Sequence, residues 1–230
     1  MRILGCENVT ARTVHSHALL ILHRSEIKTI MSREPRMVID HEIAPALRDI
    51  EFPPESNIQQ RKTMLEIYEA AWANTQKDKP GLPRNEEEEE FSNRIVEWLK
   101  YHQGMLVGEV IPIALRYLQD NPASPEIGKY EVILVDEYQD LNRAEQEFIK
   151  LLTGDKSIVI VGDDDQSIYS FKNAHPDGIR EIHDLYGECD DILFSEVRRC
   201  PKIITRLAST LISKNSNRTL GELIPYDYLN

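Results

Sequence analysis

Two short runs of apolar, mostly β-branched residues constrain the fold of this chain most strongly. They are residues 131–135 (EVILV) and 157–161 (SIVIV), and such runs are typical of strands buried on both faces of a sheet. Between them lies a helical pattern that begins with the capping box Asn142-x-x-Glu145 and ends at Gly154. Strand, helix and strand within about 30 residues form a βαβ unit. The sequence therefore predicts an α/β fold in which the two strands are parallel neighbours.

The rest of the chain is predominantly helical in pattern. Residues 9–14 predict a strand that turns into a helix over 15–22. From about 37 to 121 the apolar residues recur every three to four positions, which predicts helices throughout. Residues 191–194 predict a third strand, and residues 201–214 predict a helix that extends the α/β layer.

Composition excludes several classes of protein. No stretch of the 230 residues reaches the roughly 18 apolar residues of a membrane span, and the first seven residues do not resemble a secretory signal. The three cysteines form no C-x-x-C pair, which argues against a disulfide framework and a cysteine-rich zinc site. We therefore expect a cytoplasmic protein without a membrane anchor. A net charge of -12 disfavours broad attraction to nucleic acid but permits a narrow binding site.

Acidic clusters follow both predicted strands. The first is 136–140 (DEYQD) and the second is 162–166 (GDDDQ). Because ligands of open α/β sheets bind beyond the carboxyl ends of parallel strands, we expect both clusters to face one crevice. An apolar strand ending in Asp-Glu is the arrangement of a Walker B site, in which one carboxylate holds Mg²⁺ at the terminal phosphates and the next orients or deprotonates the attacking water. The alternative is that Asp136 and Asp163 merely cap loops and helices.

Residues after the second cluster suit a nucleotide and an unpaired nucleic-acid strand. Gln166 is a neutral amide next to the acids, so it can report on a γ-phosphate without adding charge. Tyr169 and Phe171 offer two ring faces nearby, and stacking on unpaired bases is worth roughly 1–3 kcal/mol per base. Ordinary core packing of these two rings is an equally good interpretation.

These segments carry a resemblance to a known family. Residues 136–142 (DEYQDLN) and 162–174 (GDDDQSIYSFKNA) resemble motifs II and III of the UvrD/Rep-type superfamily 1 DNA helicases. Residues 13–16 (TVHS) resemble the Thr-Phe-His-Ser segment, motif Ib, of that family. Residues 198–200 (RRC), followed by an apolar helix, resemble motif IV. The resemblance thus extends over nearly the whole chain.

The resemblance implies a parallel-sheet P-loop NTPase (RecA-like) core, incomplete at its N-terminal side, with an all-helical inserted subdomain. Residues 1–36 would be the first part of the 1A core, and residues 37–125 would be the helical 1B-like insertion. Residues 126–230 would be the second part of the core, with Walker B and motifs III and IV.

The resemblance also implies residue roles and ligands. Asp136 would coordinate Mg²⁺ and Glu137 would be the catalytic carboxylate. Gln166 would sense the γ-phosphate of ATP and couple it to DNA, and Arg199 would reach the same phosphate from motif IV. The residues implied to contact single-stranded DNA or DNA junctions are Thr13, His15, Tyr169, Phe171 and Lys172, the last of which replaces the usual arginine of the family and lacks its planar fork.

One expected element is absent from the sequence. The 230 residues contain no G-x-x-x-x-G-K-[ST] phosphate loop, and they resemble the middle of a helicase, without motif Ia and motifs V and VI. We therefore expect part of a UvrD-like ATP-dependent helicase that by itself neither hydrolyses ATP at a helicase rate nor unwinds duplex, and that has an unpaired sheet edge for the remaining helicase portions or a partner chain. Alternatives are a non-catalytic single-stranded-DNA-binding or regulatory remnant and, with less support, a metal-dependent nuclease.

Overall fold

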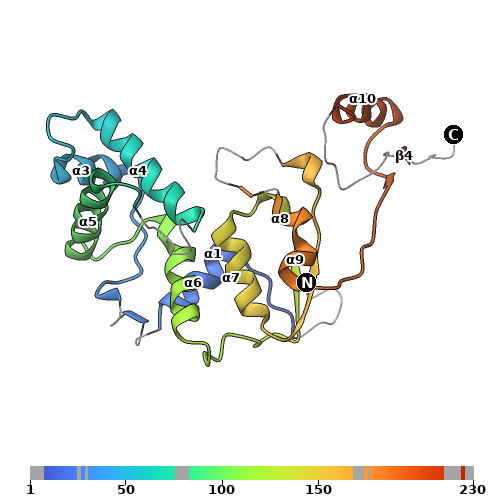
Figure 1. The fold of residues 1–230 in the computed structure, drawn as a ribbon, viewed down its shortest axis with the longest axis horizontal. Coiled ribbons are helices and arrows are strands. Elements are labelled where there is room, and N and C mark those ends of the chain that lie inside the picture. Colours follow the sequence, from blue (N-terminus) through green and yellow to red (C-terminus); the bar gives the residue numbers. More distant parts are fainter. Residues whose placement is uncertain are drawn as a thin grey trace.

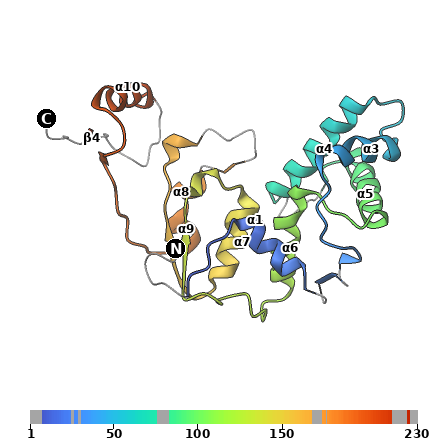
Figure 2. The ribbon, with the colours of Figure 1, turned by 180° about the vertical axis from the view of Figure 1, so that it is seen from behind.

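The computed structural model describes residues 8–24, 27–28, 31–75, 83–167, 174–175, 177–214 and 224–225. The elements, with η for 3₁₀ turns, are α1 (Val14–Leu22), α3 (Asp40–Ile50), α4 (Ile58–Ala73), α5 (Glu86–Tyr101), η3 (Val107–Glu109), α6 (Val110–Asp120), β1 (Val132–Val135), η4 (Tyr138–Asp140), α7 (Arg143–Thr153), β2 (Ser157–Ile160), η5 (Asp164–Gln166), α8 (Asp177–Arg180), α9 (Ile182–Tyr186), β3 (Glu196–Val197), α10 (Lys202–Ile212) and β4 (Ile224–Pro225). Along the longest axis, α3–α5 form one end, α1, α6 and α7 the middle, and α10 with β4 the other end (Figure 1). The view from behind shows α8 and α9 between the middle group and α10 (Figure 2).

The predicted βαβ unit is confirmed. Strands β1 and β2 pair in parallel, with Val132 opposite Ser157 and Val135 opposite Ile160. Helix α7 connects them, and its capping box forms as predicted. The Asn142 side chain accepts a hydrogen bond from the backbone N–H of Glu145 at 3.0 Å, and the Glu145 carboxylate accepts one from the backbone N–H of Asn142 at 2.8 Å. These two bonds satisfy backbone donors that a helix start otherwise leaves unpaired.

The prediction that both faces of the strands are buried is wrong. One face packs against α7, α8 and α9 and contributes Ile133, Val135, Ile158 and Ile160 to a small core. On the opposite face Leu134 is 71% exposed, and Val132, Val159 and Val161 are about half exposed. The described residues supply a helical layer on one side of the sheet only, so the side chains that alternate to the other side remain in solvent.

The middle of the molecule is a three-helix core. Helix α6 places apolar residues at intervals of three to four and packs between α1 and α7. The fully apolar centre comprises Ala18, Ile21, Leu22, Ile27, Met105, Val110, Ile111, Ala114, Leu115, Leu118, Ala144, Phe148 and Leu152. This core holds the helical side of the βαβ unit in place.

The strand predicted for residues 9–14 is wrong. Residues 9–13 have no regular secondary structure, and helix α1 begins at Val14. The Thr13 hydroxyl accepts a hydrogen bond from the backbone N–H of Ser16 at 3.1 Å, which is an N-cap interaction. The β-branched residues therefore lead into a helix cap, since no described strand pairs with them.

Helices α3, α4 and α5 form a second hydrophobic cluster, as the periodicity between residues 37 and 121 predicts. Its buried members are Val38, Leu47, Ile50, Leu65, Tyr68, Trp72, Phe91, Ile95, Leu99 and Leu106. Ile113 of α6 contacts both this cluster and the middle core. The division into residues 1–36, 37–125 and 126–230 remains a prediction, and α6 is the helix that links the two cores.

The segment after α9 departs from the predicted α/β layer. Residues 191–195 are not a strand, and the side chains of Ile192, Leu193 and Phe194 are at least 62% exposed. The strand that does form, β3, pairs in parallel with β4 in a separate two-stranded sheet. The predicted helix over residues 201–214 is confirmed as α10. Within the described ranges, no helix is both long and apolar enough to cross a membrane.

A buried ion pair fastens the two helical cores together. The Glu109 side chain is 1% exposed and pairs with Arg33, with 2.8 Å between Nη2 and Oε1. The Tyr68 hydroxyl donates to the same carboxylate at 3.0 Å, and the backbone N–H of Leu106 donates at 2.8 Å. Burial, followed by the nearby Glu109 carboxylate, raises the pKa of Tyr68 well above its ordinary value, so the phenol remains a donor. Arg33 also donates to the carbonyl of Gly104 at 3.0 Å.

We predict that Glu109→Ala lowers the free energy of unfolding by about 3–5 kcal/mol, because it leaves the buried Arg33 without its counter-ion. The matched control is Glu90→Ala, which removes an exposed carboxylate from its pair with Arg94 and is expected to cost less than about 1 kcal/mol. Urea denaturation followed by circular dichroism measures both. Equal losses in the two variants would contradict the role of Glu109.

Stability is also expected to fall on mild acidification because of His17. Burial lowers the pKa of His17, the Glu126 carboxylate opposes this, and the cations Lys129, Arg12 and Arg24 add to it. The unfolded chain then binds the proton at a higher pH than the folded chain does, so folding free energy is lost as the pH falls through about 6.5, the ordinary histidine value.

The His17→Asn variant should show a smaller loss of stability between about pH 7 and pH 5 than the unmodified protein shows. His41→Asn, at an exposed position on α3, is the control and should retain the full loss. Thermal unfolding at several pH values provides the measurement. An unchanged pH slope in His17→Asn would show that this imidazole is not the group responsible.

Candidate functional site

The acidic segments that follow β1 and β2 lie side by side. The backbone N–H of Val161 donates to the carbonyl of Val135 at 2.8 Å, and the N–H of Tyr138 donates back to the carbonyl of Val161 at 3.1 Å. Parallel pairing therefore continues past the last strand residues and brings Asp136 next to the segment that leads to Asp163. The two clusters meet at the carboxyl ends of β1 and β2, as the sequence predicts.

Gln139 joins the two clusters through its side chain. Its Nε2 donates to the Glu137 carboxylate at 2.7 Å, and its Oε1 accepts from the backbone N–H of Asp163 at 3.0 Å. The Asp163 carboxylate in turn accepts a hydrogen bond from Nε2 of Gln166 at 2.6 Å. A continuous chain of hydrogen bonds thus runs from Glu137 after β1 to Gln166 after β2.

Gly162 makes this bridge sterically possible. A Cβ atom at residue 162 would lie 2.7 Å from Oε1 of Gln139 and 2.7 Å from Cδ1 of Ile179. Both distances are far below a normal contact, so any side chain here would push the Gln139 amide out of place. Gln139 itself is 1% exposed, and the short residue opposite lets its amide reach the backbone of the second cluster.

The two acids after β1 remain accessible. Asp136 and Glu137 are both exposed, and Oδ1 of Asp136 accepts from the backbone N–H of Glu137 at 3.0 Å. Glu137 has a φ of 53°, in the left-handed region that costs energy for a residue with a side chain. Exposed carboxylate oxygens on a sharply turned backbone can reach a cation and its bound water.

The three acids after β2 do not share one role. Asp163 caps the turn η5, since its Oδ1 accepts from the backbone N–H of Asp165 at 3.0 Å. Asp164 has a fully buried side chain paired with Arg180 at 2.9 Å, and this hydrogen bond raises the pKa of the Arg180 guanidinium. Capping and ion pairing therefore account for much of this cluster, while ligand oxygens of all three acids lie within 4.8 Å of one another.

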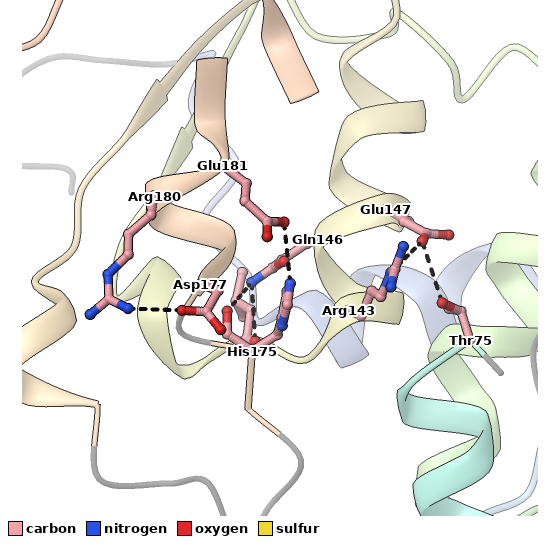
Figure 3. Close-up of polar contacts among 9 residues, drawn as sticks. Thr75, Arg143, Gln146, Glu147, His175, Asp177, Arg180 and Glu181 are labelled. Carbon is pink, nitrogen blue, oxygen red and sulfur yellow. Dashed lines mark hydrogen bonds and ion pairs between the residues drawn. The ribbon is translucent and has the colours of Figure 1, made fainter. Parts of the chain in front are cut away.

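Helix α7 anchors the chain that returns after the second cluster. Nε2 of Gln146 donates to the carbonyl of His175 at 2.9 Å and to that of Leu141 at 3.3 Å. Figure 3 shows the contact between Gln146 and His175 together with the pair between His175 and Glu181, whose closest atoms are 3.5 Å apart. Gln146 thus ties the start of α7, next to the first cluster, to the segment that leads into α8.

Other site residues expected from the sequence lie on separate elements. Thr13 caps α1, and Nδ1 of His15 in that helix lies 3.3 Å from the Glu145 carboxylate of the α7 capping box. Arg199 is exposed and follows β3, which belongs to the second small sheet rather than to the β1–β2 sheet. Three expected DNA contacts fall outside the described residues: Tyr169, Phe171 and Lys172.

Three residues that hold the segments of the candidate site together were not assigned from the sequence. Gln139, Gln146 and Arg180 hold the site through contacts with residues between 16 and 29 positions away. Gln139 stands inside the first acidic cluster, where a neutral amide among carboxylates is a visible signal. Gln146 and Arg180 lie in ordinary helical patterns, and nothing in the local sequence separates them from surface residues.

A known protein family matches the part of the chain that contains this site. The family described as "UvrD/REP helicase N-terminal domain" matches residues 2–187, which is most of the chain. The chain belongs to the UvrD/Rep helicase family. The site residues Asp136, Glu137 and Gln166 all lie inside the matched range, whereas Arg199 lies beyond it.

Two curated relatives are much longer than the segment that aligns with this chain. An ATP-dependent DNA helicase PcrA of Staphylococcus aureus (strain Mu50) is 35% identical over 128 residues, which cover 51% of this chain and 16% of that protein. A PcrA of Staphylococcus epidermidis (strain RP62A) is 36% identical over 111 residues, covering 48% of this chain and 14% of that protein. The chain thus matches a small part of each curated relative.

We predict that Gln139→Leu lowers the free energy of unfolding by about 1–3 kcal/mol, because the backbone N–H of Asp163 loses its buried acceptor while side-chain size is nearly kept. Gln59→Leu, on the exposed face of α4, is the matched control and should change stability by less than about 0.5 kcal/mol. Chemical denaturation compares the two variants. If Gln139→Leu is as mild as the control, the bridge between the clusters does not stabilise the fold.

Proposed function

We propose that this chain carries the magnesium-binding and DNA-coupling part of a UvrD-type, ATP-dependent DNA helicase. The observation that supports this most directly is the hydrogen-bond chain from Glu137 through Gln139 and Asp163 to Gln166. It joins the proposed catalytic carboxylate to the residue expected to sense the γ-phosphate. A displacement of either side chain would therefore shift the other through these hydrogen bonds.

The donor set after β1 fits a magnesium ion and a nucleotide. Mg²⁺ prefers carboxylate oxygen and retains several waters, which requires an accessible carboxylate, and Asp136 is exposed at the strand end. When bound, Mg²⁺ with ATP supplies charge neutralisation at the terminal phosphates. In this proposal Asp136 binds the ion and Glu137 orients and accepts a proton from the attacking water. Gln139 fixes the Glu137 carboxylate, and Gln166 donates its amide toward the γ-phosphate.

The DNA-facing part of the proposal rests on residues around this site. Thr13 and His15 are placed by the start of α1, and the contact of His15 with Glu145 sets that start beside the α7 capping box. We infer that these two residues, with Tyr169, Phe171 and Lys172, contact single-stranded DNA, and that Arg199 reaches the γ-phosphate.

The outer face of the β1–β2 sheet is apolar and exposed, so it can pack against another part of the helicase. Leu134, Val132, Val159 and Val161 form a contiguous apolar strip that is 48–71% exposed. Continuous exposed apolar surface on a sheet is a signature of an interaction site. We propose that other helicase portions, in the same chain or in a partner chain, cover this strip.

A second candidate is a non-catalytic single-stranded-DNA-binding or regulatory module. The observation that favours it is the absence of a G-x-x-x-x-G-K-[ST] sequence from the 230 residues, because backbone amides and a lysine of that loop normally hold the triphosphate. In either case we propose that these 230 residues do not hydrolyse ATP at a helicase rate by themselves. DNA-stimulated hydrolysis by the purified chain would refute this.

We predict that Asp136→Asn weakens binding of Mn²⁺, used as a paramagnetic probe for Mg²⁺, at least about tenfold in the presence of ATP, since it removes the ionic ligand. Asp155→Asn is the matched control, because Asp155 is exposed and precedes β2 at the opposite end of the sheet. Electron paramagnetic resonance measures free Mn²⁺ directly. Equal Mn²⁺ affinities for the two variants would exclude Asp136 as the magnesium ligand.

The two candidate functions differ in how DNA binding responds to nucleotide. A labelled oligothymidylate followed by fluorescence anisotropy gives the affinity of the chain with and without Mg²⁺ and ATP. A coupled helicase site predicts that the affinity changes on adding nucleotide and that Gln166→Ala removes the change. An affinity that nucleotide leaves unaltered, at an ATP concentration that saturates the Asp136-dependent binding of Mn²⁺, favours the non-catalytic module, and cleavage of the oligonucleotide would favour a nuclease.

A further inference from the structure

Three different metal-binding side chains converge on the surface where the chain leaves α9. Nε2 of His183 lies 3.0 Å from Oδ2 of Asp191. Sγ of Cys189 lies 3.4 Å from Nδ1 and 3.8 Å from Nε2 of the same ring. Ligand atoms of all three residues fall within 4.8 Å of one another, and all three side chains are exposed. None of them belongs to the acidic site at the ends of β1 and β2.

The backbone at Gly187 produces this convergence. Its N–H donates to the carbonyl of His183 at 2.9 Å, which closes the last turn of α9. Its φ of 80° lies in the left-handed region, where glycine carries no steric cost. The chain therefore reverses direction after the helix, and residues 189 and 191 return to the side of the helix that carries His183.

The spacing of the donor atoms is close to that which a tetrahedral metal ion requires. Zinc binds imidazole nitrogen and carboxylate oxygen at about 2.0–2.1 Å and thiolate sulfur at about 2.3 Å, so neighbouring ligands of one zinc lie about 3.3–3.6 Å apart. The separations of Nε2 from Oδ2 and from Sγ, 3.0 and 3.8 Å, bracket that range. Because Sγ lies nearer to Nδ1 than to Nε2, the exposed Cys189 side chain would have to rotate to bring its sulfur within bonding distance of an ion held between Nε2 and Oδ2.

We propose that His183, Cys189 and Asp191 form a zinc-binding site on the surface of this protein. The donor set is one neutral imidazole, one thiolate and one carboxylate, and its two negative charges balance Zn²⁺. On binding, the Cys189 thiol forms a bond from sulfur to zinc and releases its proton to solvent. A water molecule completes the fourth position, as in zinc sites with three protein ligands.

Two simpler interpretations explain less of this arrangement. A surface ion pair between His183 and Asp191, with the Cys189 thiol hydrogen-bonded to the same ring, accounts for the contacts but not for the presence of three side chains that can all bind zinc. A reactive redox thiol accounts for Cys189 alone and leaves the imidazole and the carboxylate beside it unexplained. Imidazole and thiolate together favour zinc over the hard, oxygen-seeking Mg²⁺ proposed for Asp136.

Zinc at this position would fix the path of the segment between α9 and β3. The chain that leaves α9 runs out to β3 and α10, away from the helices of the middle group (Figure 2). Its apolar residues Ile192 and Phe194 are exposed, at 76% and 77%, so they provide little packing to fix its path. Bonds from one ion to His183 and to Cys189 and Asp191 would set the direction in which this connection departs.

The test is a Co²⁺ titration of the metal-free 230-residue chain, followed by absorbance, because Co²⁺ occupies zinc sites and reports its ligands. We expect one equivalent of Co²⁺ to give a thiolate-to-metal charge-transfer band and the visible bands of tetrahedral coordination, and one equivalent of Zn²⁺ to abolish both. Cys189→Ser should remove the charge-transfer band. His183→Ala and Asp191→Asn should each weaken Zn²⁺ binding at least about tenfold in a competition assay with a chromophoric chelator.

Cys200→Ser is the matched control, because Cys200 is a free cysteine of the described chain outside the cluster, and it should leave the spectrum and affinity unchanged. All three proposed ligands are exposed, so circular dichroism should show every variant folded. The proposal is overturned if no charge-transfer band forms at one equivalent, if Cys189→Ser retains it, or if Cys200→Ser loses it. These outcomes do not depend on the helicase proposal, since Mg²⁺ and oxygen ligands give no sulfur band.

Discussion

The parallel pairing of β1 with β2 is the constraint on which the rest of this structure depends. It places two acidic segments side by side at the carboxyl ends of the strands. Continued pairing beyond the strands brings the backbone of Tyr138 within hydrogen-bond distance of Val161. Carboxylates in such proximity repel one another unless a hydrogen-bond network or a cation compensates. Gln139 supplies that network from within the first segment, and the absence of a side chain at Gly162 leaves room for its amide.

Within the described residues, helices pack against only one face of the β1–β2 sheet. Ile149 of α7 and Ile179 of α8 pack on the inner face of the strands, and Gln146 fastens the returning chain to α7. On the far side of α7, the middle core and the buried Glu109 ion pair connect the α3–α5 group to the same helix layer. Figure 3 shows a second link, in which the Thr75 hydroxyl at the end of α4 donates to the Glu147 carboxylate of α7 at 3.4 Å.

Local patterns predicted the βαβ unit because its signals are local: apolar runs, a capping box and a terminal glycine. They failed where the outcome depends on a partner. Residues 9–13 and 191–194 have strand-like composition but no described strand beside them, and the apolar run of β2 could not reveal that a helical layer covers only one face. A neutral amide among carboxylates marks the position of Gln139, but its bridging role could not be predicted, because it depends on a contact with Asp163, 24 residues away. The roles proposed for Asp136, Glu137 and Gln166 rest on the sequence pattern and on motif resemblance, and the structure adds the hydrogen bonds that run from Glu137 through Gln139 and Asp163 to Gln166.

The most direct test of this account is paramagnetic broadening of side-chain amide signals in the nuclear magnetic resonance spectrum on adding Mn²⁺ with ATP. Because one ion between the two strand ends would lie close to both amides, we predict selective broadening of Gln139 and Gln166, while Gln59 on α4 remains sharp. Asp136→Asn should restore the sharp signals. Broadening that spares Gln139 and Gln166, or that persists unchanged in Asp136→Asn, would contradict a shared metal–nucleotide site at the ends of β1 and β2.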